Sequence, residues 1–159
     1  MSYLLRRLIL IGTISCLAAC ANFKAAEVRT EAKLPYHHSG SDLKVSWQTI
    51  QTGKDATVSG LVKITRKVIV RNMDLSIDLL DSEGTVVSEG EVASNSVNMK
   101  MNDYFPFSVK LKDTTLVKGN VLEFIIRYHT NDGSWYGHAW QSSFQADALT
   151  GAVIEEQRL

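Results

Sequence analysis

The four histidines are the residues whose chemistry stands out in this sequence, because neutral imidazole is a common protein ligand for zinc and copper. His37 and His38 are neighbours, and adjacent side chains of an extended chain point in opposite directions. His129 and His138 flank a turn-like stretch at residues 131–134. If the middle two residues of that stretch form a hairpin loop, the two imidazoles lie diagonally on one face, with β carbons roughly 7 Å apart. The sequence supplies no third ligand there, so we assign no metal site and keep a metal or small ligand at this hairpin as an alternative.

Patterns typical of enzymes are missing from the sequence. No serine sits in a Gly-x-Ser-x-Gly elbow, and neither a phosphate-binding loop nor a dinucleotide fingerprint occurs. Both cysteines, Cys16 and Cys20, lie in the N-terminal apolar segment, which leaves the rest of the chain without a thiol. A pair of carboxylates for glycoside hydrolysis stays open, although the acidic residues mostly occupy turns and the outer faces of predicted strands. We therefore predict a protein without catalytic residues and without a cofactor.

The first 19 residues have the features of a secretory signal peptide. Arg6 and Arg7 provide a positive start, residues 8–17 form a short apolar stretch, and Ala18 and Ala19 are small residues suited to a cleavage site. The stretch is shorter than the ~20 apolar residues of a membrane span. The pattern predicts export of the chain, with a retained membrane anchor as an alternative.

The segment Leu17-Ala18-Ala19-Cys20 resembles the lipobox of bacterial lipoproteins. The resemblance implies that the thiol of Cys20 receives a diacylglycerol and that cleavage leaves this cysteine as the first residue. Two or three acyl chains give a lasting anchor, since each buried methylene contributes about 0.8 kcal/mol. Ala21 stands where enterobacterial lipoproteins kept at the inner membrane carry Asp, so the resemblance favours the outer membrane, facing the periplasm. An ordinary signal peptide cleaved after an alanine is the alternative.

Residues 20–41 are expected to be the lipidated N-terminus and a flexible tether. The segment has no sustained periodicity, and it contains Pro35 and Gly40 among scattered charges. The folded domain is then residues 42–159, which is enough chain to bury a core without disulfides.

Period-two alternation of apolar and polar residues recurs from Asp42 onward and predicts β-strands. The cleanest alternation runs over residues 72–79. Asp81 and Gly84 then suit a hairpin turn. Further along the chain, Pro106 indicates an edge strand or a bulge. About seven such strands without a convincing helix predict an all-β fold, an immunoglobulin-like antiparallel β-sandwich. The apolar positions expected to face its core are Leu43, Val45, Trp47, Val58, Val62, Ile64, Met73, Leu75, Ile77, Leu79, Phe105, Phe107, Val109, Leu111, Leu122, Phe124, Ile126 and Tyr128.

Three neighbouring segments carry a family likeness: Val58-Ser59-Gly60-Leu61-Val62, the strand from Leu75 to Leu80, and Asp81-Ser82-Glu83-Gly84-Thr85-Val86-Val87. Over residues 56–92 the chain resembles bacterial envelope domains of the FxLYD and related immunoglobulin-like type. There a Gly-x-Val strand is followed by a strand ending in Asp-x-x-Gly-x-Val-Val, although the Asn usual after the first strand is missing here. The resemblance implies a non-enzymatic envelope module and supports the fold rather than a particular function.

The last predicted hairpin carries the strongest candidate for a binding surface. With a two-residue loop, position 129 faces 136 and position 127 faces 138, which places small residues of one strand against large core residues of the other. Tyr, Trp and Arg dominate binding hot spots. A bulge or a one-residue slip would instead turn Trp140 inward as core, and the sequence leaves both registers open. In the first register the face away from the core gathers Ile125, Arg127, His129, Tyr136, His138 and Trp140.

Overall charge indicates no particular partner. Lys plus Arg equals Asp plus Glu at 17 each, and removal of residues 1–19 with their two arginines leaves 15 against 17. No global field therefore favours nucleic acid. We predict a lipid-anchored envelope lipoprotein whose sandwich binds another envelope component, a protein, with its oligomeric state left open.

Overall fold

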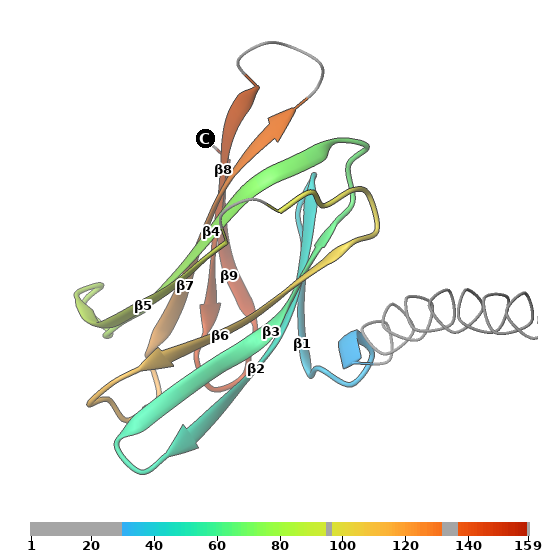
Figure 1. The fold of residues 1–159 in the computed structure, drawn as a ribbon. Helices are drawn as coiled ribbons and strands as arrows, with labels where there is room; N and C mark the ends of the chain where they lie inside the picture. Colours follow the sequence, from blue (N-terminus) through green and yellow to red (C-terminus); the bar gives the residue numbers. More distant parts are fainter. Residues whose placement is uncertain (1–29, 95–96, 132–136, 159) are drawn as a thin grey trace, which may run out of the picture. The chain divides into compact units, whose positions relative to one another are not determined.

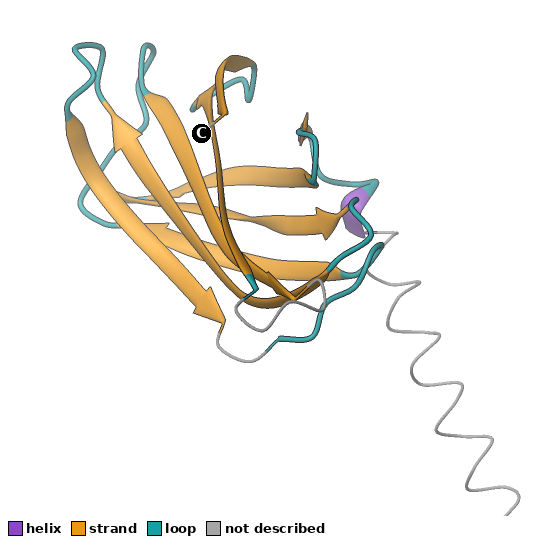
Figure 2. Cartoon of the chain, turned by 90° about the horizontal axis from the view of Figure 1, so that it is seen from above, coloured by secondary structure: helices purple, strands orange, loops and turns teal. Residues whose placement is uncertain are grey.

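The structure, a computed structural model, describes residues 30–94, 97–131 and 137–158, the last four of these by their backbone only. In this part of the chain, nine strands form two antiparallel sheets packed face to face (Figures 1 and 2). The strands are β1 (Tyr36–Ser39), β2 (Leu43–Thr52), β3 (Asp55–Ile64), β4 (Ile69–Leu80), β5 (Val86–Ser94), β6 (Tyr104–Leu111), β7 (Val121–Asn131), β8 (His138–Asp147) and β9 (Val153–Arg158). Among these residues, no helix has the length and apolar character to cross a membrane.

The order of the strands confirms the predicted all-β sandwich. Sheet A has the order β1-β2-β3-β6, and sheet B has the order β5-β4-β7-β8-β9. The seven predicted strands correspond to β2 through β8, whose division between the sheets is immunoglobulin-like, with the chain crossing from one sheet to the other after β3, β5 and β6. The two short outer strands, β1 and β9, extend this seven-stranded centre by one strand in each sheet.

Strand β1 moves the start of the domain into the segment that was predicted to be tether. Tyr36 pairs with Trp47 and Ser39 pairs with Lys44, so β1 is a regular member of sheet A. The hydroxyl of Tyr36 also donates a hydrogen bond of 2.8 Å to the backbone carbonyl of Leu149. A strand of four residues is too short to show an alternation of apolar and polar residues, so the sequence pattern gave no sign of β1. The compact unit begins at Leu34.

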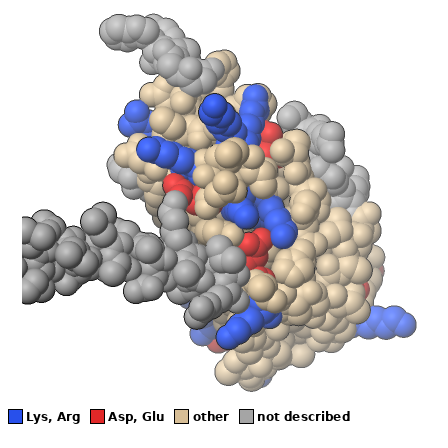
Figure 3. Space-filling view, turned by 90° about the vertical axis from the view of Figure 1, so that its right-hand side faces the viewer, with Lys and Arg blue, Asp and Glu red and all other residues tan. Residues whose placement is uncertain are grey.

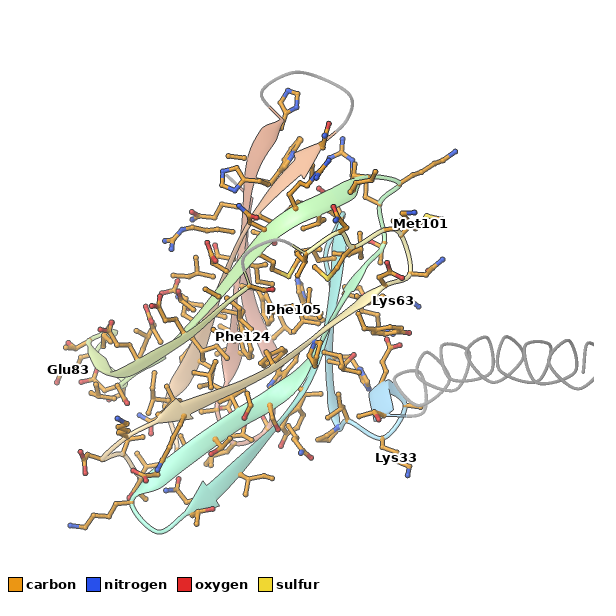
Figure 4. All side chains as sticks on the ribbon, viewed as in Figure 1. Lys33, Lys63, Glu83, Met101, Phe105 and Phe124 are labelled. Atoms are coloured by element: carbon orange, nitrogen blue, oxygen red, sulfur yellow. The ribbon has the colours of Figure 1, made fainter. Side chains whose placement is uncertain are left out.

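The core lies between the two sheets, and every apolar residue predicted to face it is buried. Trp47 is fully buried, with its ring 5.0 Å from that of Phe124 and 5.6 Å from that of Phe144. Figure 4 labels Phe105 and Phe124, which extend into this interior from opposite sheets. Gly60 is the partner of Trp47 across the strands, and a β carbon at Gly60 would collide with the carbonyl oxygen of Ser46. A side chain is therefore excluded at Gly60 by its neighbours.

Local signals in the sequence also proved accurate. A side-chain oxygen of Asp81 accepts hydrogen bonds of 2.9 Å from the backbone N–H groups of Glu83 and Thr85, and Gly84 has a φ of 81°. This is the turn chemistry predicted between β4 and β5. Pro106 lies in β6, an edge strand of sheet A, where a missing N–H breaks no ladder on the open side.

Candidate functional site

The observed register of the last hairpin divides the predicted binding face. His129 pairs with Ala139 and Arg127 pairs with Gln141, a shift of three residues from the predicted pairing. Because side chains alternate across a strand, an odd shift moves all of β8 to the opposite face. Arg127 and His129 lie on the outer face of sheet B, where the guanidinium of Arg127 donates to Gln141 at 3.1 Å.

His138 and Trp140 lie on the other face of sheet B, the one turned toward sheet A. Thr130 pairs with His138 and Tyr128 pairs with Trp140, and both β7 residues are buried. The prediction of one surface holding all of these residues is therefore wrong: Trp140 turns to the inner face, as in the alternative register, but it stays 37% exposed and is not part of the core. Tyr136 lies outside the described residues.

Phe144 carried the signal that could have fixed this register. It lies on the same side of β8 as Trp140, and its ring stacks on Phe124 with a centroid distance of 4.6 Å. The predicted register would have put Phe144 on the outer face. The gain from burying the Phe144 ring in the core therefore outweighs the local turn signal.

Trp140 forms the centre of a polar and aromatic cluster at one end of the sandwich. The indole N–H donates to the hydroxyl of Thr130 at 3.2 Å, and the guanidinium carbon of Arg66 lies 4.7 Å from the centroid of the indole ring. The His138 ring is 6.3 Å away in a tilted arrangement. Trp140 keeps 37% of its surface exposed, so one part of the ring is fixed and the rest is available for contact.

Two further residues hold Arg66 in place. Its guanidinium donates to a carboxylate oxygen of Asp42 at 3.2 Å, and the same oxygen accepts a 2.9 Å hydrogen bond from the hydroxyl of Tyr128. Burial, followed by the hydrogen bond to Asp42, raises the pKa of Tyr128 above its ordinary value. The phenol thus stays a donor at neutral pH. We call Asp42, Arg66, Tyr128, Thr130 and Trp140 the Trp140 cluster.

The Trp140 cluster combines an exposed indole with an arginine that is already oriented. A guanidinium over an aromatic face is attractive because of the charge distribution of the ring, and Arg keeps further donors for a partner. The residues of the Trp140 cluster come from two distant parts of the chain: strands β7 and β8, and the loops before β2 and after β3. Their contact could not be predicted from their positions in the sequence. The arrangement offers an aromatic surface with hydrogen-bond donors beside it.

The structure places the histidines in separate surroundings. His37 Nδ1 lies 2.9 Å from the hydroxyl of Ser46, and the ring of His38 stacks on Phe144 at 4.1 Å; both belong to β1. His129 and His138 lie on opposite faces of sheet B, so the diagonal pair considered for a metal does not form. Over the described ranges, no group of three or more His, Cys, Asp or Glu side chains could hold a metal ion.

The outer face of sheet B brings together carboxylates that the sequence treated as separate. Asp78 pairs with Glu89 on one side and with Glu123 on the other. Burial raises the pKa of Asp78, and the charges of Glu89 and Glu123 add to the effect, while Arg127 opposes it. A hollow of about 330 Å³ lies beside this row, lined by Ser76, Asp78, Glu89, Gly90 and Glu91.

Comparison with known proteins yields only distant structural likenesses. No family model matches the chain, and no curated protein matches it significantly. A β-glucuronidase from Bacteroides uniformis is similar over 65% of this chain, at 12% identity and a TM-score of 0.38. A protein from Archaeoglobus fulgidus is similar over 70% of this chain and 96% of its own length, at 15% identity and a TM-score of 0.39. The part of the β-glucuronidase that aligns is 13% of that chain.

Proposed function

We propose that this chain is a lipoprotein of the bacterial cell envelope, anchored through Cys20, whose β-sandwich is a non-catalytic module that binds another envelope protein. The anchor is supported by the lipobox-like residues 17–20 at the end of a signal-like apolar segment. Residues 1–19 would be removed, and Ala21 favours the outer membrane with the domain facing the periplasm.

The Trp140 cluster is the observation that carries the binding role. Hot spots in protein interfaces are enriched in Trp, Tyr and Arg, and a side chain that is fixed before binding loses less entropy when a partner docks. Here Trp140 is held by Thr130 and Arg66, and Arg66 is held in turn by Asp42. The indole is thus exposed yet already ordered. An envelope protein that offers an apolar surface with a carboxylate beside it fits this chemistry.

A catalytic role lacks a comparable arrangement in the described residues. Asp78, whose pKa is raised, lies on the outer face of a sheet between two other carboxylates, and burial followed by repulsion from Glu89 and Glu123 accounts for that shift. The chain has no cysteine after Cys20. We therefore assign no catalytic residue.

The anchor is tested by the variant Cys20→Ser. Metabolic labelling with palmitate, followed by separation of membranes from soluble protein, should show lipid on the natural chain and none on the variant. The variant should also leave the washed membrane fraction. A natural chain that takes up no palmitate would contradict the anchor.

The binding role is tested by crosslinking in intact cells. Trp140→Ala and Arg66→Ala should each lose the same crosslinked envelope protein, with circular dichroism unchanged. The matched control changes Arg127→Ala and His129→Ala, which alters the same hairpin on its outer face and should keep that partner. Retention of the partner by both cluster variants would exclude the Trp140 cluster, and its loss in the control alone would place the site on the outer face.

A further inference from the structure

Charge is divided unevenly between the two outer faces of the sandwich, although the totals in the sequence balance. Basic side chains gather on the outer face of sheet A, on the two loops that follow β3 and β5, and at the start of β4, as the blue atoms in Figure 3 show. We call this region the basic face, and it consists of Lys44, Lys63, Lys67, Arg71 and Lys100, beside Arg66 of the Trp140 cluster. The carboxylate row of Asp78, Glu89 and Glu123 lies on the outer face of the other sheet.

The nearby carboxylates leave part of the basic face uncompensated. Asp42 is engaged with Arg66 and Tyr128, and Asp103 accepts a 2.8 Å hydrogen bond from the backbone N–H of Lys100. Three other basic side chains are exposed and, within the described residues, lie beyond salt-bridge distance of any carboxylate: Lys67, Arg71 and Lys100. Their charge is therefore available to an external anion.

Exposed apolar side chains lie among these charges. Met101 follows Lys100 directly and is 45% exposed, and Ile69 lies between Lys67 and Arg71 with 37% of its surface exposed. Figure 4 labels Met101 and Lys63 on the same side of the sandwich, far from Glu83. Basic residues interspersed with apolar ones are the composition that favours the interface between membrane and water.

The chain joins the sandwich on this same face. Leu34, where the domain begins, packs against Leu61 and Tyr104 on the outer face of sheet A. The ammonium group of Lys63 lies over the Tyr104 ring, 5.3 Å from its centroid. Thirteen residues separate Cys20 from Leu34. Even a fully extended chain of that length spans only about 45–50 Å, so a domain anchored through Cys20 stays close to its membrane and is attached to it on the basic face.

We propose that the basic face lies on the anionic surface of the membrane that holds the lipid anchor, with Lys67, Arg71 and Lys100 against lipid phosphate groups. Anionic surfaces attract basic residues within about a Debye length, roughly 8–10 Å at physiological salt. Met101 enters the interface beside them. The acidic face of sheet B then points away from the lipid. This inference rests on the proposed anchoring at Cys20.

The test uses the lipidated chain in vesicles and a single reporter cysteine. Because the natural chain has no cysteine after Cys20, Met101→Cys can be labelled with a fluorophore alone, and Glu91→Cys places the same label on the acidic face. Vesicles contain phosphatidylethanolamine and phosphatidylglycerol, or phosphatidylcholine alone, each with lipids that carry a quencher in the headgroup. Quenching at position 101 should exceed that at position 91 severalfold in the anionic vesicles, and high salt should abolish the difference.

Charge variants complete the test. In the Met101→Cys background, Lys67→Gln, Arg71→Gln and Lys100→Gln together should remove the extra quenching, since each lost cation weakens association about fivefold. The matched control makes the same change in charge at the other end of the sandwich, with Lys54→Gln, Lys112→Gln and Lys118→Gln, and should behave like the parent. Equal quenching at positions 101 and 91 on a chain that floats with the vesicles would overturn the proposal and assign the basic face to another acidic partner. A chain that does not float at all would instead refute the anchor.

Discussion

The hydroxyl of Tyr128 donates a 2.9 Å hydrogen bond to the carboxylate of Asp42, 86 positions earlier in the chain. The bond joins β7 of one sheet to the loop that precedes β2 of the other. Since Asp42 also holds Arg66, it links the core of the sandwich to the exposed indole of Trp140.

Tyr128→Phe should destabilise the protein by about 1.5–3 kcal/mol, the range for a hydrogen bond to a charged group. Tyr36→Phe removes a hydrogen bond to a neutral carbonyl, that of Leu149, and should cost about 0.5–1.5 kcal/mol. Urea unfolding followed by circular dichroism measures both. Equal losses would mean that the charge of Asp42 adds nothing to the bond.

Asp78→Asn should stabilise the protein at neutral pH by about 0.5–1 kcal/mol, because like charges directly opposite across strands are destabilising. The pKa of Asp78 is raised in the folded state, so the folded protein binds this proton more tightly than the unfolded chain. Stability due to this group therefore rises as pH falls from neutrality through the raised pKa and levels off below the ordinary value of 3.8.

Urea unfolding at several pH values tests this expectation. The advantage of Asp78→Asn over the natural chain should shrink as the solution is acidified. Asp74→Asn, on the same strand and face, is the control, because Asp74 faces Arg127 rather than another carboxylate. A gain that is constant with pH would show that charge repulsion is not its cause.

Asp147→Ala should destabilise the turn between β8 and β9 by about 1 kcal/mol, the usual net value of an intramolecular hydrogen bond. One oxygen of Asp147 accepts hydrogen bonds from the backbone N–H groups of Leu149 and Thr150 at 3.0 and 2.7 Å, and these bonds help to lower its pKa. The pH dependence of this contribution to stability is opposite to that of Asp78. Asp147 stabilises the folded protein at pH values above the ordinary pKa of an Asp, and this stabilisation is lost as the pH falls through the lowered pKa of the folded state. A variant whose deficit persists in acid would contradict this reading.

Gly60→Ala should cost more than Gly84→Ala, for a different physical reason. A β carbon at Gly60 meets the carbonyl oxygen of Ser46, so backbone must move, and steric changes in a packed core cost about 1–3 kcal/mol or more. Gly84 has open space around it and a φ of 81°, which gives only the penalty of about 1–2 kcal/mol for a left-handed residue. Thermal unfolding of the two variants shows which loses more stability. A larger loss for Gly84→Ala would mean that the left-handed backbone at Gly84 costs more than the steric clash at Gly60.

The sequence revealed the strands whose own residues alternate, and it missed features that depend on which strands pair. The burial of Met73, Leu75 and Ile77 could be predicted from the alternation within β4 alone, whichever strands lie beside it. The carboxylate row needs Asp78, Glu89 and Glu123 to meet from three strands, and the Trp140 cluster needs Arg66 to reach across to β8. Such contacts follow from register, and the register of the last hairpin was itself predicted wrongly.

The bond between Tyr36 and Leu149 also determines how the domain would respond to mechanical load. A pull on the chain before Leu34 first loads the packing of Leu34 on Leu61 and Tyr104 and then reaches β1 at Tyr36, so it would peel β1 from β2 one pair at a time rather than shear the whole strand. Tyr36 is the first residue of β1 in the path of that force. Its hydroxyl is hydrogen-bonded to the turn after β8, and its ring lies against Gly151 of the same turn. This hydrogen bond and ring contact therefore oppose the detachment of β1 at the residue where it would begin.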